Sequence, residues 1–261
     1  MDLGIKGKAA IVTGGSRGIG RETARQFLEE GVRVRICGRN AETLERTRIE
    51  LAKATGGEVH AVVADMTKEA DIARLVASAR ERFGSIDILV NNAGQMYSGR
   101  FDVMTDAGLK EQLDTKLFGF LRTIRLVYPA MKAQRWGRIV NLIGGAGKEP
   151  DPYMLGSGIT NSALLNLTKS LSTEFGEDNV LVNAVCPGWV DTEMGRSGIA
   201  RIGKAMGLSQ EKAFVAVGKM APLGKVLEPD EVGGLVAYLA SEDARNVTGQ
   251  AIVIDGGQVM P

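Results

Sequence analysis

Seven short apolar runs recur along the chain, each bounded by glycine or polar residues. They occupy residues 9–13, 32–37, 59–64, 86–90, 138–143, 180–185 and 251–254. Most are continuous runs of valine, isoleucine and leucine rather than alternating patterns, which is typical of strands covered on both faces. We therefore predict seven buried β-strands.

Between the predicted strands, apolar residues recur with the spacing of one helix face. After the first strand, this face holds Ile19, Thr23, Ala24, Phe27 and Leu28. Further stretches of this kind lie at residues 42–54, 69–83, 105–134, 152–175 and 229–241. Because strands and helices alternate, we predict a Rossmann-like, doubly wound α/β fold with a seven-stranded parallel sheet and helices on both faces.

The chain of 261 residues suits one doubly wound domain, and no shift in composition marks a linker, so we expect a single domain over residues 1–261. One segment, residues 189–221, is irregular and rich in glycine and methionine. Since a long loop within a compact domain often covers a site, we predict a substrate lid there. Trp189 and Met194 would form an apolar wall of the substrate pocket.

Charge and hydropathy exclude several classes of partner. The chain holds 32 basic and 31 acidic residues and no basic run interleaved with aromatic residues, so we expect no nucleic-acid binding. No apolar run is long enough to span a bilayer and no export signal is present, so we expect no membrane association and a cytoplasmic location. We assign no metal site. His60, Cys37 and Cys186 lie in strand patterns, and we interpret them as structural residues.

A glycine-rich turn follows the first predicted strand directly and opens the first helix. Glycine allows a tight turn and a close backbone approach there, while N–H groups at the helix N-terminus remain available for a pyrophosphate. The turn therefore predicts a dinucleotide site rather than an ordinary strand-to-helix connection. We assign to this site Gly14, Ser16, Arg17, Gly18, Ile19 and Gly20.

The end of the second predicted strand indicates which dinucleotide binds. NAD-binding folds usually carry Asp or Glu at this point, whereas the 2′-phosphate of NADP(H) calls for arginine. Here the strand ends in Cys37-Gly38-Arg39, without an acid. Arg17 and Arg39 can clamp a phosphate through charge-assisted hydrogen bonds, so we predict NADP(H) as the cofactor. The alternative is two solvated surface arginines.

Residues after the third and fourth predicted strands extend the cofactor site, because ligands of open α/β sheets bind at the carboxyl ends of the strands. Asp65 follows the third strand, and Asn91-Asn92-Ala93-Gly94 follows the fourth. The alternative for each is a turn-forming residue. We assign to the cofactor site Asp65, Met66, Asn91, Ala93 and Gly94.

The sequence resembles the short-chain dehydrogenase/reductase family over essentially its whole length. The family signature TGxxxGxG is matched by Thr13, Gly14, Gly18 and Gly20, and further matches are Asp65, the NNAG of residues 91–94, Pro187-Gly188 and Asp255-Gly256-Gly257. The resemblance implies an NADP(H)-dependent oxidoreductase with a small-molecule substrate, assembled as a homo-oligomer, a dimer or more usually a tetramer. It also implies cofactor contacts from Pro187, Gly188, Val190 and Thr192, the last with the nicotinamide amide.

The usual catalytic residues of this family are missing. Typical members carry an Asn, a Ser and a Tyr/Lys pair spaced YxxxK on one helix. When the sequence is registered on Asn141 and the run at 167–171, these positions hold Lys116, Gly144, Ser157 and Asn161. The pattern is similar to an atypical branch of the family that includes the bacilysin-pathway enone reductase. That resemblance implies conjugate reduction with NADPH.

Three functional hypotheses follow from the missing groups. Reduction of a conjugated C=C bond develops an enolate, which a cation stabilises, so we predict Lys116 as the electrophilic group, with Ser157 and Asn161 facing the same site from the next helix. Loss of the usual groups leaves a non-catalytic NADP(H)-binding protein as one alternative. The other is a carbonyl reductase whose proton donor is Tyr153, helped by Lys116 or Lys148.

Overall fold

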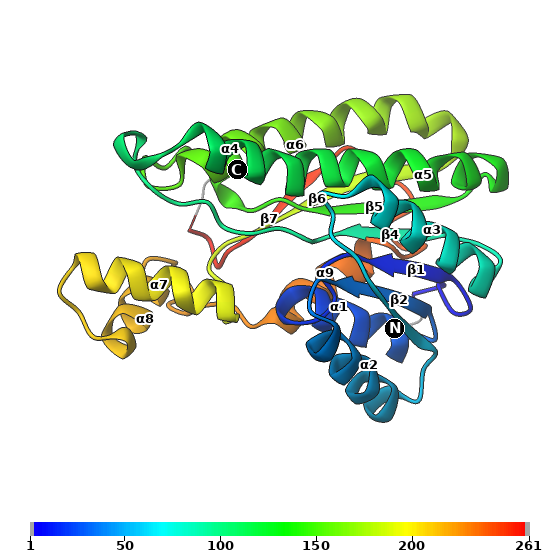
Figure 1. Cartoon of the computed structure of the whole chain (residues 1–261), viewed down its shortest axis with the longest axis horizontal. Helices are drawn as coiled ribbons and strands as arrows, with labels where there is room; N and C mark the ends of the chain where they lie inside the picture. Colours follow the sequence, from blue (N-terminus) through cyan, green and yellow to red (C-terminus); the bar gives the residue numbers. More distant parts are fainter. Residues whose placement is uncertain (1–2, 259–261) are drawn as a thin grey trace.

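The computed structural model describes residues 3–258, and within them seven strands form one sheet (Figure 1). The strands are β1 (Ala9–Val12), β2 (Arg33–Gly38), β3 (Val59–Val63), β4 (Ile88–Asn91), β5 (Gly137–Leu142), β6 (Val180–Pro187) and β7 (Ala251–Ile254). Their order across the sheet is β3-β2-β1-β4-β5-β6-β7, and every neighbouring pair is parallel. The predicted doubly wound fold is confirmed.

Helices cover both faces of this sheet (Figure 1). One face carries α1 (Gly18–Glu29), α2 (Ala41–Thr55) and α9 (Pro229–Leu239), and the other carries α3 (Glu69–Phe83), α5 (Gly119–Gln134) and α6 (Leu155–Phe175). Two separate hydrophobic clusters follow this division, with Phe27 and Val236 in one and Ile72 and Val127 in the other. Every residue of β1, β4 and β5 is buried, which explains why their apolar runs do not alternate.

The single helix predicted at residues 105–134 is interrupted. It consists of α4 (Asp106–Gln112), a π-helical stretch (Leu113–Phe118) and α5. A π-helical turn is wider than an α-helical turn, so it changes the direction of the side chains that follow, and such turns are frequent at functional sites. Lys116 lies within this stretch.

The helix α6 begins at Leu155, later than predicted, because a turn precedes it. The side chain of Asp151 accepts a hydrogen bond from the backbone N–H of Tyr153 (2.8 Å), across Pro152. Short 3₁₀ turns lie at Phe101–Val103, Gly145–Gly147 and Gly176–Asp178.

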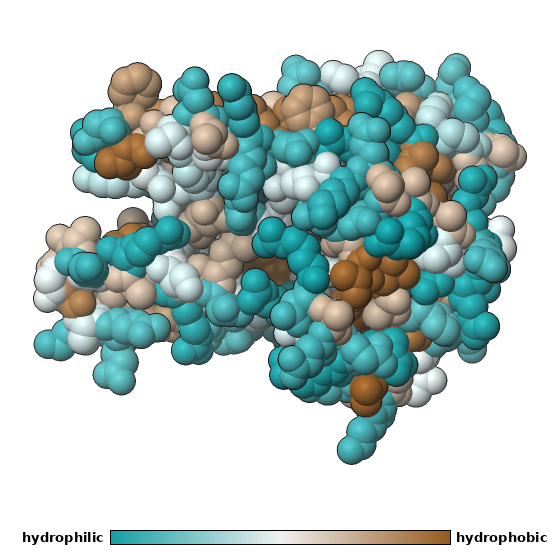
Figure 2. All heavy atoms as spheres, viewed as in Figure 1, coloured by the Kyte–Doolittle hydropathy of each residue, from teal (hydrophilic) through white to brown (hydrophobic). Residues whose placement is uncertain are grey.

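The segment at residues 189–221 is more regular than its sequence indicated, because it contains α7 (Glu193–Ala205) and α8 (Gln210–Gly218). Glycines inside α7 obscured the helical pattern, yet Gly203 allows close packing: a Cβ atom there would lie 2.6 Å from the Cβ of Ala213. The two helices share a small hydrophobic cluster of their own. They project from the sheet, and Figure 2 shows a hollow in the surface between them and the part that contains α4.

Within residues 3–258, no helix combines the length and the hydropathy that a membrane-spanning segment needs. The same part of the chain contains no cluster of side chains suited to a metal ion. Cys37 and Cys186 are buried free thiols, as predicted. The ring nitrogen Nε2 of His60 lies 3.1 Å from Glu58 Oε1, which agrees with a structural role.

Candidate active site

The glycine turn after β1 has a backbone that requires glycine at defined positions. Gly14 and Gly18 have φ angles of 67° and 54°, in the left-handed region. At Gly20 the limit is space, since a Cβ atom would lie 2.4 Å from the carbonyl oxygen of Gly14. The turn and the first residues of α1 are therefore packed backbone against backbone.

Asn92 and Thr13 fasten this turn to the loop after β4, and the sequence analysis assigned neither side chain. Asn92 Nδ2 donates to the carbonyl oxygens of Thr13 (2.9 Å) and Gly14 (3.1 Å). Thr13 Oγ1 accepts from the backbone N–H groups of Asn92 (2.9 Å) and Ala93 (3.1 Å). The second Asn of the NNAG run could have indicated this contact. Its partners are distant in the sequence, however, so no local pattern reveals it.

The N-terminus of α1 fits a pyrophosphate group. Arg17 occupies the N-cap position without capping the helix through its side chain, and the first turn contains no acidic residue. The first N–H groups of the helix therefore remain available to a ligand, and the helix dipole favours an anion. The residues present thus fit the diphosphate of a dinucleotide.

Gly20→Ala is expected to lower the free energy of unfolding by about 2 kcal/mol, because overpacking at a site without free volume forces the backbone to shift. It should also abolish NADPH binding. Chemical denaturation and calorimetric titration measure the two effects. Gly176→Ala is the matched control, since a Cβ atom there meets nothing within 4 Å. If Gly20→Ala behaves like this control, the close packing described above is wrong.

The two arginines that were predicted to bind one phosphate together have different surroundings in the structure. Arg17 forms a salt bridge with Glu193 at the start of α7, and both side chains are exposed. Arg39 lies exposed after β2. Hydrogen bonds from Thr67 lower the pKa of Asp65, and the positive charge of Arg39 contributes to the same shift. Arg39 is therefore the more available of the two arginines, whereas Arg17 is engaged by Glu193 of the predicted lid, residues 189–221.

The other predicted cofactor residues differ in how accessible they are. Asn91 is completely buried, and its Nδ2 donates to Asn141 Oδ1 (3.0 Å), so its side chain connects β4 and β5. Asp65 Oδ1 accepts from the hydroxyl of Thr67 (2.9 Å). The methyl group of Thr192 lies 3.0 Å from the position of a Cβ atom on Gly18, which places the start of the lid beside the glycine turn. The remaining residues assigned to the cofactor site are buried or half-buried: Ser16, Ile19, Met66, Ala93, Gly94, Pro187, Gly188 and Val190.

The amino group of Lys116 is held by two acceptors from different elements. Nζ donates to the carbonyl oxygen of Ile143, just after β5 (2.7 Å), and to Asn161 Oδ1 on α6 (2.8 Å). Burial lowers the pKa of Lys116 from 10.5 to about 8, because it disfavours the ammonium form and neither acceptor carries a charge. The site therefore holds an amine that titrates close to neutral pH.

Gly144 and Asn161 fit each other closely beside this amine. Gly144 has a φ of 96°, and a Cβ atom on it would lie 3.2 Å from Asn161 Nδ2. Asn161 is only 4% exposed. Any side chain at position 144 would be strained and would crowd the amide that holds Lys116. Lys116, Gly144 and Asn161 thus form one cluster of residues in mutual contact, with Asn161 between the other two.

Ser157 lies one helical turn before Asn161 on α6, but its hydroxyl is already occupied. Ser157 Oγ accepts from the backbone N–H of Tyr97 (3.0 Å) and donates to its carbonyl oxygen (3.2 Å). The phenol of Tyr97 accepts from the backbone N–H of Thr105 (3.0 Å). These contacts position the loop after β4, and no pattern in the sequence indicated this role for Tyr97.

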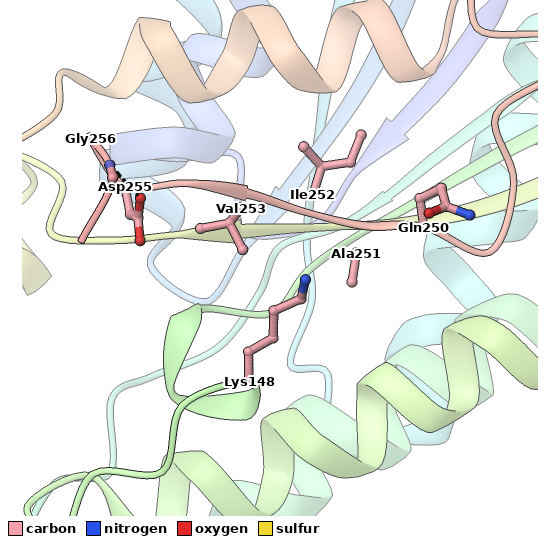
Figure 3. A pocket seen from close by; sticks show the side chains of 8 residues that line it. Lys148, Gln250, Ala251, Ile252, Val253, Asp255 and Gly256 are labelled. Atoms are coloured by element: carbon pink, nitrogen blue, oxygen red, sulfur yellow. Dashed lines mark hydrogen bonds between the residues drawn. The ribbon is translucent and has the colours of Figure 1, made fainter. Parts of the chain in front are cut away.

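Tyr153 and Lys148 do not meet in this structure. Tyr153 is 59% exposed, and its hydroxyl lies 3.5 Å from Arg100 Nη1. Lys148 extends toward β7 and lines a groove of about 520 Å³ with residues of that strand and of the turn after it (Figure 3). Neither side chain forms a hydrogen bond with Lys116, so the geometry disfavours Tyr153 as a proton donor assisted by either lysine.

The lid contacts the loop after β4 through apolar side chains. The ring of Trp189 lies 2.8 Å, and the sulfur of Met96 3.2 Å, from the position of a Cβ atom on Gly198 of α7. Trp189 packs with the lid cluster, whereas Met194 is 46% exposed. Trp189 and Met96 therefore pack against the same face of α7, and Met194 contributes apolar surface.

Comparison with known proteins places the chain among reductases. Residues 14–258 match the family described as enoyl-(acyl carrier protein) reductase. The chain is similar to oxidoreductase UcpA of Escherichia coli O157:H7, with 37% identity over 98% of this chain and 96% of that protein. A crystal structure of the actinorhodin polyketide ketoreductase with NADPH is 36% identical, with a TM-score of 0.93 and coverage of 96% and 97%. YwfH, an NADPH dependent reductase involved in bacilysin biosynthesis, is 27% identical, with a TM-score of 0.91 and coverage of 97% and 99%.

Proposed function

Because the chain belongs to the short-chain dehydrogenase/reductase family, we propose that it is an NADPH-dependent oxidoreductase that reduces a C=C bond conjugated with a carbonyl group. One observation carries the proposal. The amino group of Lys116 is fixed by Asn161 and Ile143, and by sequence register Lys116 and Asn161 stand at positions where typical members of the family carry catalytic residues. The site thus offers a positioned amine instead of the usual Tyr/Lys pair.

NADPH supplies the hydride when it is bound. The glycine turn and the uncapped N-terminus of α1 would hold its diphosphate, and Arg39 would hold its 2′-phosphate. The actinorhodin ketoreductase and YwfH are both described with NADPH, which supports this choice of cofactor. Thr192 lies beside Gly18, and we propose that it contacts the amide group of the nicotinamide.

Lys116 explains why a conjugated substrate suits this site better than an isolated ketone. Hydride addition to the far carbon of an enone leaves negative charge on an enolate oxygen, which an ammonium group within hydrogen-bonding distance stabilises. Asn161 and the carbonyl of Ile143 fix the direction of the Lys116 amine. Reduction of an isolated ketone instead produces an alkoxide, a stronger base that requires full protonation as it forms. Ser157 holds the loop after β4 and takes no part in proton transfer.

The pH profile of enone reduction is expected to follow the ionisation of Lys116. Its pKa is lowered to about 8 by burial, so the ammonium form dominates below this pH. With NADPH saturating, kcat/KM for the enone should be level below pH 8 and should fall about tenfold per pH unit above it. A profile that rises through the same pH region would mean that the neutral amine is the active form, and would contradict this assignment.

The proposal is tested with 4-phenyl-3-buten-2-one and its saturated counterpart, 4-phenyl-2-butanone. Calorimetric titration with NADPH and NADH gives the cofactor preference, and absorbance of reduced nicotinamide then follows turnover. We expect NADPH to bind more tightly and to be oxidised with the enone but not with the ketone. Turnover of the ketone alone would support carbonyl reduction, and binding without turnover of either compound would support the non-catalytic alternative.

Carbonyl reduction is the second candidate, because several similar proteins are named as ketoreductases or ketoacyl reductases. It needs a proton donor that this chain would have to supply from Lys116 or Tyr153. The exposure of Tyr153 and its contact with Arg100 argue for Lys116. Tyr153→Phe tests only the phenol-dependent form of this candidate: a reductase that uses the phenol would lose activity, whereas one that uses Lys116 would keep it.

Assembly as a homo-oligomer, a dimer or tetramer, is a further part of the proposal. β7 lies at one edge of the sheet, and its outer side borders the groove that Lys148 lines (Figure 3). Apolar side chains on the long helices are also exposed, among them Leu126 of α5 and Ile159 of α6. A second copy of the chain would cover either surface.

A further inference from the structure

Arg201 of α7 lies where the lid meets the loop after β4. Its Nη2 is 3.5 Å from the sulfur of Met96, and Gly198, three residues earlier on the helix, faces the same methionine. The face of α7 that carries Gly198 and Arg201 is therefore turned toward this loop. In Figure 1 the two elements lie on opposite sides of the hollow that Figure 2 shows.

The charge of Arg201 is not neutralised by any acid in residues 3–258. A thioether is a weak hydrogen-bond acceptor, so the contact with Met96 leaves the guanidinium donors largely unused. Arg196, on the same helix, is instead paired with Asp191. On the opposite wall, Glu111 is bonded to Gln95 (3.2 Å) and makes no ion pair with Arg201. Arg201 is exposed, and its donors are accessible to a ligand in the hollow.

A second arginine, Arg100, lies in the loop after β4, but it has a partner. Its guanidinium lies 5.4 Å from the centre of the Tyr153 ring and donates to the Tyr153 hydroxyl (3.5 Å). Stacking of this kind stabilises a guanidinium in place. Arg201 is therefore the better candidate for binding an anionic group.

The path from Arg201 to the candidate active site is short. Met96 is two residues after Gly94, whose Cβ position lies 3.4 Å from Cδ of Lys116. Two residues of extended chain span about 7 Å, so this path, side chains included, puts Arg201 at most on the order of 20 Å from the Lys116 amino group. An elongated substrate that lies along this path can contact both groups.

We infer that Arg201 binds the carboxylate of an anionic substrate, and thereby selects carboxylate-bearing enones over neutral ones. This inference rests on the proposed function, because it places the reducible bond at Lys116. The two cations then bind different groups of the substrate. Lys116 faces the carbonyl oxygen, and Arg201 binds the carboxylate through a charge-assisted, bidentate contact.

The test compares 4-(3-oxobut-1-enyl)benzoate with the corresponding carboxamide, which has the same shape without the charge. For the parent protein, KM for the carboxylate should be about tenfold lower than KM for the amide. Arg201→Gln should abolish the difference, with kcat little changed, and Arg201→Lys should retain part of it. Arg80→Gln is the matched control, since Arg80 is an exposed arginine on α3 with no acid partner in residues 3–258; it should behave like the parent.

Binding is measured separately, so that the anion site is tested even if turnover fails. The saturated compounds, 4-(3-oxobutyl)benzoate and its amide, are titrated by calorimetry into the protein loaded with NADP⁺. Equal affinity for acid and amide overturns the inference, and so does a preference for the acid that survives Arg201→Gln. Preference for the acid without oxidation of NADPH by either enone supports the anion site and contradicts the proposed reaction instead.

Discussion

Lys116→Met is expected to lower kcat for enone reduction about 10²- to 10³-fold, the usual effect of removing one group that stabilises a developing oxyanion. Methionine has a similar length and keeps the apolar part of the side chain, so the packing near Gly94 should survive. The substitution removes the amino group that bonds to Ile143 and Asn161. Because the glycine turn and Arg39, which would hold the diphosphate and the 2′-phosphate, lie elsewhere, the Kd for NADPH should change little.

Single-turnover kinetics with 4-phenyl-3-buten-2-one measures this effect on the chemical step. Lys110→Met serves as the control, since Lys110 is exposed on α4 of the same helical segment. The fall in activity above pH 8 should also disappear in the residual rate of Lys116→Met, because the titrating group is gone. A Lys116→Met protein with the parental rate and pH profile would remove Lys116 from the mechanism.

Arg39→Asp is expected to reverse the cofactor preference, lowering the ratio of NADPH affinity to NADH affinity by about 10²-fold or more. The change removes a charge-assisted contact with the 2′-phosphate and adds a carboxylate that repels it. Asp65, which already lies near Arg39, makes the local charge still more negative. The same carboxylate can accept a hydrogen bond from the 2′-hydroxyl of NADH, so affinity for NADH should be retained or improved.

Calorimetric titration with the two dinucleotides gives this ratio directly. Arg17→Gln is the informative comparison, because Arg17 is already paired with Glu193 and should contribute less. If Arg17→Gln reduces NADPH affinity more than Arg39→Asp does, the salt bridge with Glu193 does not hold Arg17 away from the phosphate. An unchanged ratio in both variants would leave NADPH selectivity without a structural basis in these two arginines.

The sheet and the glycine turn could be predicted because their signals are local. A strand covered on both faces must be apolar at every position, as β5 is. A turn that brings Gly14 and Gly20 within contact of each other tolerates no side chain, which leaves a recognisable spacing in the sequence. The assignment of Lys116 to one of the family's catalytic positions rests on sequence register alone, and it stays a prediction.

The rest of the site depends on contacts between distant segments, which no local pattern reports. The π-helical turn that carries Lys116 is a single turn within a longer helical segment, and no residue type in the sequence marks it. The hydroxyl group of Ser157 is of a type that can take part in catalysis. In the structure, however, it is hydrogen-bonded to the backbone of Tyr97. Within residues 189–221, α7 was missed because glycine inside it is unfavourable to an isolated helix and is tolerated only through its packing.

The fit between Gly144 and Asn161 makes this active site difficult to convert back, by single steps, to one with the usual residues of the family. Gly144→Ser alone would place a Cβ atom 3.2 Å from Asn161 Nδ2 on a backbone with a φ of 96°. Asn161→Lys alone would replace the acceptor of Lys116 with a second amine, so two cations would face each other where one is now hydrogen-bonded. Either single substitution therefore disturbs the groups that hold the Lys116 amine, so the usual residues could enter this site only together.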